Sequence, residues 1–189
     1  MFSTKINSNF IFEETILKGV YLIHPFVRYD ERGYFLKDYS KKVFNKNNIE
    51  HDLKEVFYTS SQPGVLRGLH FQRVKQQSKL VRCVFGKIYD VVVDLRKDSE
   101  TFGKWIGFYL SETNKKQLFI PEGFAHGYLV LKQSIVSYKC GEDFYEEYDD
   151  GIIWNDNDIG IKWPLHLVKE LIISEKDKNL QTFNLFNSN

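Results

Sequence analysis

The sequence of 189 residues has only one alanine, Ala125, and only two cysteines, Cys83 and Cys140. Alanine is the strongest helix former, so its scarcity, together with an aromatic content of 16%, favours a β-rich fold. Both cysteines lie in apolar, strand-like runs, which indicates buried thiols rather than a disulfide. No long apolar stretch lies near the start of the sequence. We therefore expect neither a signal peptide nor a membrane span, and a cytoplasmic location.

The sequence also has no excess of one charge, because 26 Lys and Arg residues nearly balance 25 Asp and Glu residues and leave a formal net charge of +1. This balance gives no electrostatic reason to expect a nucleic-acid or membrane partner. The length suits one well-packed domain. We find no linker, repeat or change of composition that would divide residues 1–189, and we predict a single domain.

Two short runs carry most of the functional information. Residues 64–72 read Gly-Val-Leu-Arg-Gly-Leu-His-Phe-Gln, and residues 120–127 read Ile-Pro-Glu-Gly-Phe-Ala-His-Gly. Each run places one histidine, His70 or His126, on a glycine-bounded β segment, which predicts two imidazoles in one pocket of a small barrel. The second run has the Pro-x-Gly-x-x-His pattern of cupin barrels. A metal-binding cupin would carry His-x-His in the first run, but here Gln72 takes the place of the second histidine. We therefore expect proton transfer and no metal site.

Short segments rich in β-branched and aromatic residues alternate with turn signals along the chain. This pattern is typical of an all-β sandwich or barrel, and we predict a cupin-type jelly-roll β-barrel with a few short helices. The expected strands are irregular ones at 9–29 before a turn at 29–33, then 79–85 and 87–95 joined by a tight turn at Gly86, then 105–110, 117–120, 127–131 and 134–139. The expected helices are 40–47, with Ser40 as N-cap, and a turn at 174–177, and residues 184–189 are expected to fray.

The sequence resembles the nucleotide-diphosphate 4-keto-sugar 3,5-epimerases, the family of the dTDP-4-dehydrorhamnose enzyme. The resemblance extends over most of the chain, from Asp-Glu-Arg-Gly at 30–33 to Ser-Glu-Lys-Asp at 174–177. It includes the two histidine runs and the motifs at 79–82, 91–96, 101–103, 117–119, 138–139, 154–156 and 163–164. It implies an epimerase without metal or cofactor. A base removes a proton beside the keto group, a cation stabilises the enolate, and an acid returns a proton to the opposite face.

The resemblance assigns four catalytic roles. His70 is implied to be the general base, a role that suits imidazole because it titrates near neutral pH. Tyr138 is implied to be the proton donor, with Tyr145 as a weaker rival, and Lys79 would hold the enolate oxygen. Asp177 would orient His70, as a carboxylate does in catalytic triads. By residue type alone, the same tyrosine, lysine and aspartate would be interpreted as packing, a solvated strand edge and part of a helix cap.

The resemblance also implies a set of substrate contacts. Arg32 and Arg67 would clamp the diphosphate, because guanidinium groups bind phosphate oxygens at two points. His126 would bind the sugar or its keto oxygen. Further substrate contacts are expected from Gln72, Asp150 and Lys176. Trp154 is interpreted as barrel packing.

Two departures from the family pattern affect substrate recognition. Lys37 stands where the dTDP-rhamnose enzymes carry an acid, and residues 55–60 replace a stretch similar to Gln-Asp-Asn. Such changes alter the hydrogen bonds that set specificity. The substrate is therefore left open between dTDP- and GDP-linked 4-keto sugars, hexose or heptose, of a bacterial capsule or O-antigen pathway. The family also implies a homodimer that exchanges its N-terminal strands, 10–28 here, and brings Arg32 to the partner's pocket.

Three other functions remain as alternatives. A sugar-nucleotide ketoisomerase would move the carbonyl instead of inverting a centre, but the run 67–70 together with Tyr138 argues against it. A non-catalytic sugar-binding barrel would use the same residues as pocket lining. A metal-dependent cupin oxygenase would require a bound metal.

Overall fold

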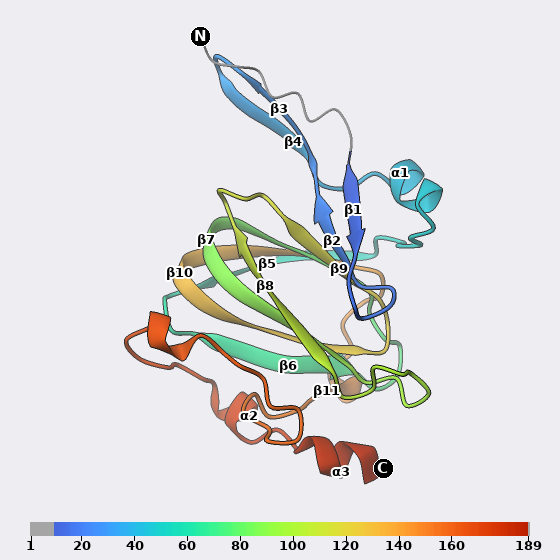
Figure 1. Ribbon diagram of the computed structural model, residues 1–189, viewed down its shortest axis with the longest axis vertical. Helices are drawn as coiled ribbons and strands as arrows, with labels where there is room; N and C mark the ends of the chain where they lie inside the picture. Colours follow the sequence, from blue (N-terminus) through green and yellow to red (C-terminus); the bar gives the residue numbers. More distant parts are fainter. Residues whose placement is uncertain (1–9, 189) are drawn as a thin grey trace.

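The fold is known from a computed structural model, which describes residues 10–188. The fold is built on a nine-stranded sheet that is folded over on itself (Figure 1). Its two central strands, β7 (Lys79–Asp94) and β10 (Phe124–Cys140), are long and run antiparallel to one another over their whole length. The predicted all-β jelly-roll architecture with a few short helices is confirmed.

The two halves of each central strand lie in different layers. In the first layer, the start of β7 pairs with β9 (Gln117–Ile120), and the end of β10 pairs with β5 (Glu55–Ser61). In the second layer, the end of β7 pairs with β8 (Trp105–Ser111), and the start of β10 pairs with β6 (Leu66–Gln72). The layers extend through β2 (Tyr21–His24), beside β9, with β1 (Ile11–Glu14) at its edge, and through β11 (Asp149–Gly151), beside β6.

The turn predicted at Gly86 is wrong, because the chain continues through this glycine as one strand. Gly86 has φ +82°, and a Cβ there would collide with the carbonyl oxygen of Gln133 on β10. The glycine thus permits a bend at which β7 passes from one layer to the other. The segments 127–131 and 134–139 are likewise parts of the single strand β10, which has irregular register between Val130 and Val136.

A separate hairpin, β3 (Phe26–Asp30) and β4 (Gly33–Lys37), extends away from the layers (Figure 1). The strands predicted at 9–29 are therefore β1, β2 and β3, although Asn9 lies outside the described residues. The helix α1 (Lys41–Lys46) follows its predicted N-cap Ser40, whose side chain makes no capping hydrogen bond.

Short helices cover the second layer near the C-terminus. The remaining helical elements are η1 (Glu146–Tyr148), η2 (Leu165–Leu167), α2 (Glu175–Lys178) and α3 (Phe183–Ser188). The helix α3 corrects the expectation that 184–189 would fray, although Asn189 lies outside the described residues. Phe183 and Phe186 of α3 pack against the second layer, which explains why this segment is ordered.

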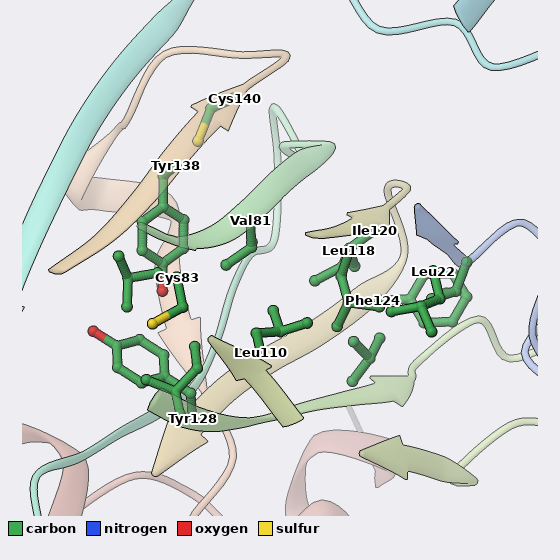
Figure 2. Close-up of a cluster of buried hydrophobic side chains, with 14 of the residues drawn as sticks. Leu22, Val81, Cys83, Leu110, Leu118, Ile120, Phe124, Tyr128, Tyr138 and Cys140 are labelled. Carbon is green, nitrogen blue, oxygen red and sulfur yellow. The ribbon is translucent and has the colours of Figure 1, made fainter. Parts of the chain in front are cut away.

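The main core lies between the layers and contains residues from both central strands, including Cys83, Tyr128, Tyr138 and Cys140 (Figure 2). Both thiols are free and buried, as predicted, and burial raises the pKa of each to about 11. None of the helices in the described part of the chain is long and apolar enough to cross a membrane.

Candidate active site

A cavity of about 400 Å³ opens between the two layers. Its walls include ten residues of the four strands that meet there: Glu55, Phe57, Thr59, Arg67, His70, Gln72, Lys79, His126, Tyr128 and Tyr138. His70 on β6 and His126 at the start of β10 come from the second layer. Lys79 at the start of β7 and Tyr138 near the end of β10 come from the first layer.

The two predicted imidazoles lie side by side, because His70 and His126 are direct partners in the register of β6 and β10. His70 Nε2 donates a hydrogen bond to Asp177 Oδ1 at 2.9 Å. Asp177 Oδ2 accepts a second bond from the backbone N–H of Gly68 at 3.0 Å. Burial alone would raise the pKa of Asp177, but the hydrogen bonds from His70, Gly68 and Ser174 outweigh it and lower the pKa. The carboxylate therefore stays charged and fixes the His70 tautomer, leaving Nδ1 as the basic nitrogen.

Asp177 takes part both in the cap of α2 and in the contact with His70, through different atoms. Ser174 Oγ accepts from the backbone N–H of Asp177 at 3.1 Å and so caps α2, while the Asp177 side chain points to His70. By sequence, orienting His70 and capping the helix were competing interpretations of this aspartate, and the structure contains both contacts.

His126 has a carboxylate partner that the sequence analysis did not identify. Its Nε2 lies 2.9 Å from both oxygens of Asp90, which is fully buried. Burial raises the pKa of Asp90, although the His126 imidazole opposes this effect. Alternation along β7 places Asp90 on the same face as Ile88 and Val92, and a lone acid on such an apolar face was the signal that could have found it.

Lys79 lies at the start of β7 and lines the cavity. Burial lowers the pKa of its ammonium group, with weaker opposing effects from Cys140 and Asp149. Among the described residues, no carboxylate forms an ion pair with Lys79. A cation that lines the cavity and has no carboxylate partner among the described residues is suited to receive negative charge that develops on a bound molecule.

Tyr138 also lines the cavity, whereas Tyr145 is absent from its walls. The Tyr138 ring lies 5.8 Å from the His126 ring and 6.5 Å from that of Tyr128, and its hydroxyl points toward Tyr128 (Figure 2). Burial raises the pKa of Tyr138 well above its ordinary value, which keeps the phenol protonated. This placement favours Tyr138 over Tyr145 as the proton donor.

Some of the residues predicted to contact the substrate lie at the cavity, and others do not. Arg67 is exposed at the cavity, where its Nε donates to Ser61 Oγ at 3.2 Å. Lys176 pairs with Asp149, a cavity residue that the sequence analysis did not name. Asp150 is not among the cavity residues, because neighbouring residues of β11 face opposite sides and its carboxylate binds Arg73 and Gln181.

Gln72 lines the cavity, but its amide is occupied by backbone groups. Oε1 accepts from the N–H of Tyr145 at 2.7 Å, and Nε2 donates to the carbonyls of Lys75 and Asp143 at 2.6 and 3.3 Å. In this structure the side chain therefore holds two loops together at the cavity rather than presenting free hydrogen-bonding groups to a ligand.

The two departures from the family pattern lie in different places. Glu55, Phe57 and Thr59 alternate along β5 and all line the cavity, so the replaced stretch 55–60 forms part of its wall. Lys37 lies at the end of β4, with its ammonium 6.0 Å from the centre of the Phe26 ring, and is not a cavity residue. Arg32 is also remote, at the tip of the β3–β4 hairpin, where it pairs with Asp30 and is 84% exposed.

Within residues 10–188, no three or more His, Cys, Asp or Glu side chains are grouped so as to hold a metal ion. The site thus combines two imidazole–carboxylate pairs, a cavity-lining ammonium group and a protonated phenol around one cavity. Groups of these kinds are able to transfer protons and to stabilise an anion, as an epimerase-type member of the cupin-like proteins requires.

Comparison with known proteins specifies the family. The family model for dTDP-4-dehydrorhamnose 3,5-epimerase matches residues 14–184, and the chain belongs to this family. It is therefore an epimerase, an enzyme of the isomerase class, and the predicted resemblance is confirmed.

Two curated relatives and one solved structure illustrate the similarity. The dTDP-4-dehydrorhamnose 3,5-epimerase of Methanothermobacter thermautotrophicus is 53% identical over 91% of this chain and 94% of its own length. The enzyme of the same name from Shigella flexneri is 43% identical over 90% and 94%. The crystal structure of a dTDP-6-deoxy-D-glucose-3,5-epimerase from Legionella pneumophila, in complex with dTDP-4-keto-L-rhamnose, is 36% identical, with a TM-score of 0.91 over 95% of this chain and 96% of that one.

Proposed function

We propose that the protein inverts carbon 3, carbon 5 or both in a dTDP-linked 4-keto-6-deoxyhexose. The observation that carries the proposal is the origin of His70 and Tyr138 in opposite layers of the barrel, with the cavity between them. Inversion requires that a proton leave one face of the sugar and another arrive on the opposite face. Relatives named for dTDP sugars support dTDP over GDP as the nucleotide.

The first half of the reaction is proton removal. Nδ1 of His70 takes a proton from the carbon beside the keto group, and the electrons of the C–H bond move onto the keto oxygen. The Asp177 carboxylate stabilises the imidazolium that results. Lys79 stabilises the enolate oxygen, and His126, held by Asp90, hydrogen-bonds the sugar.

The second half is proton delivery. The electrons return from the enolate oxygen to carbon, which takes the hydroxyl proton of Tyr138 on the opposite face. The phenolate left behind is reprotonated from solvent, and His70 releases its proton to solvent. Arg67 binds the diphosphate at the mouth of the cavity, and Lys176 contributes to the same nucleotide-sugar contact.

The test is NMR in D₂O with dTDP- and GDP-linked 4-keto sugars, hexose and heptose. Deuterium incorporation and inversion with the dTDP hexose are expected, both lost in His70→Ala, because removing a general base costs about 10²–10⁴-fold. Preference for a GDP-linked heptose would replace the proposed substrate. A moved carbonyl would indicate a ketoisomerase. No reaction with any 4-keto sugar would favour a non-catalytic binding barrel.

The roles of Tyr138 and Lys79 are separable in the same experiment. Tyr138→Phe should slow inversion more than deuterium incorporation into recovered substrate, because His70 still removes and returns a proton on one face. Lys79→Ala should slow both, since both pass through the enolate. If Tyr138→Phe slowed both equally, Tyr145 would be the next candidate for the acid.

We further propose that residues 1–189 act as one domain within a homodimer that exchanges N-terminal strands. The β3–β4 hairpin supports this, because it leaves the barrel with Tyr29, Tyr34 and Phe35 exposed and Arg32 at its tip (Figure 1). Arg32 would then reach the partner's cavity. Solution scattering at micromolar concentration should give the mass of a dimer, and a monomer would contradict the proposal. The two free thiols fit a reducing cytoplasm, where we place the enzyme.

A further inference from the structure

We propose that Phe57 is a positioning residue that holds the Tyr138 ring in the orientation needed to deliver its proton. The inference rests on the proposed function. The two rings are stacked, with centroids 4.7 Å apart and planes inclined by only 10°. The sequence alone indicated no role for Phe57 in the reaction.

Tyr138 requires such a support because its hydroxyl makes no hydrogen bond to any residue in the described part of the chain. The orientation of the phenol is therefore set by packing. His126 meets the ring edge-on, at 76°, and Tyr128 is tilted by 44° at a longer distance. Phe57 contributes the nearly parallel surface, which restricts displacement of the whole ring, and with it the hydroxyl, in the direction perpendicular to the ring plane.

The strand register brings the two rings together. Phe57 of β5 is the direct cross-strand partner of Tyr138 of β10, and such partners have side chains in contact on one face of a sheet. Alternation along β5 turns Phe57 toward the cavity with Glu55 and Thr59.

Core packing does not account for Phe57. The ring remains 38% exposed and does not belong to the main buried cluster that contains Tyr138. A large aromatic side chain kept at the edge of a cavity, with its face on the proton donor, is better explained by its effect on that donor.

The consequence for the reaction is specific to one step. Delivery requires the Tyr138 oxygen to lie in line with the reacting carbon, and a phenol whose whole ring has swung away from the Phe57 face cannot donate to it. Removal of the proton by His70, and its return to the same face, do not use Tyr138. Loss of the stack should therefore lower inversion relative to deuterium incorporation, whereas a general structural defect should lower both.

The experiment compares the two rates by NMR in D₂O for Phe57→Leu and for Phe57→Met, which keep an apolar side chain without a flat face. The ratio of inversion to incorporation should fall roughly two- to tenfold, the population change expected from losing one stacked aromatic pair. Phe57→Tyr keeps the ring and should restore the ratio. The matched control is Tyr58→Leu on the next residue of β5, which is 63% exposed and lines no part of the cavity.

A second comparison uses the Tyr138→Phe background, in which Phe57→Leu should not lower the ratio further, because the donor is already absent. The inference is overturned if the Phe57 variants leave the ratio unchanged, or lower both rates in parallel, while the unaltered enzyme is active. If the unaltered enzyme neither incorporates deuterium nor inverts any 4-keto sugar, the proposed function itself fails, and the inference fails with it.

Discussion

Replacing Asp177 with asparagine should disable the base while leaving the fold intact. The Asp177 side chain, which is 6% exposed, binds His70 through Oδ1 and the Gly68 N–H through Oδ2. In Asp177→Asn the amide oxygen should remain on Gly68, because only it can accept from that N–H. The amide NH₂ then faces His70 Nε2, which must become an acceptor. The ring proton therefore moves to Nδ1, the nitrogen that has to be free to act as base.

The expected loss follows from two effects. A hydrogen bond to a charged group contributes about 1.5–3 kcal/mol, which corresponds to roughly 10- to 150-fold in rate if it acts mainly in the transition state. The reversed tautomer adds to this, and a comparable change in a catalytic triad costs about 10⁴-fold. We therefore expect kcat to fall by at least about 10²-fold, with little change in KM.

The assay is steady-state kinetics with the dTDP-linked 4-keto hexose, together with deuterium incorporation, which should fall in parallel. Because the folded pKa of Asp177 is lowered from 3.8, its ionised form stabilises the fold above that pH, and this stabilisation is lost as the pH falls through the folded pKa. The variant should lack this part of the acid sensitivity in denaturation measurements. Near-normal kcat in a folded Asp177→Asn would refute the reasoning.

Three further predictions concern stability and metal dependence. Lys79→Met should abolish activity yet raise the free energy of unfolding at neutral pH by about 1 kcal/mol, because it removes a partly buried charge that has no carboxylate partner among the described residues. In the unaltered protein this penalty should fade as the pH rises from the lowered folded pKa toward 10.5, as urea denaturation at several pH values would reveal. Gly86→Ala should cost about 2 kcal/mol or more in the same assay, since φ is +82° and the new Cβ meets the Gln133 carbonyl; an unchanged midpoint would contradict this. Activity should survive exhaustive chelation, and a loss that one particular metal restores would overturn the proton-transfer mechanism.

The sequence predicted the elements whose signals are local. The strand at 117–120, the helix after Ser40 and the helical turn after Ser174 all lie where a short strand-like run and two N-cap residues indicated. The turn predicted at Gly86 was wrong, because a glycine between two apolar runs gives the same local signal in a hairpin turn and in a bend within one strand. Only the position of β10 beside it distinguishes the two, and that is a non-local property.

The site shows the same division. The family resemblance brought His70 and Asp177 together, although they are 107 residues apart in the sequence. It did not find Asp90, because the sequence alone does not show that His126 lies beside it on the next strand. The resemblance implied Asp150 and not the cavity-lining Asp149, because position in a motif does not show which way a side chain faces. That choice depends on the register of β11 against β6.

The central position of β10 means that the site and the fold should fail together. This strand carries His126 near one end and Tyr138 near the other, and it pairs with β5, β6 and β7. Detaching any of these neighbours would separate residues that line the same cavity. Backbone amides of β10 should be among the slowest to exchange with solvent, and loss of activity in denaturant should coincide with global unfolding. In this protein the active site is therefore expected to belong to the most stable cooperative unit rather than to a flexible periphery.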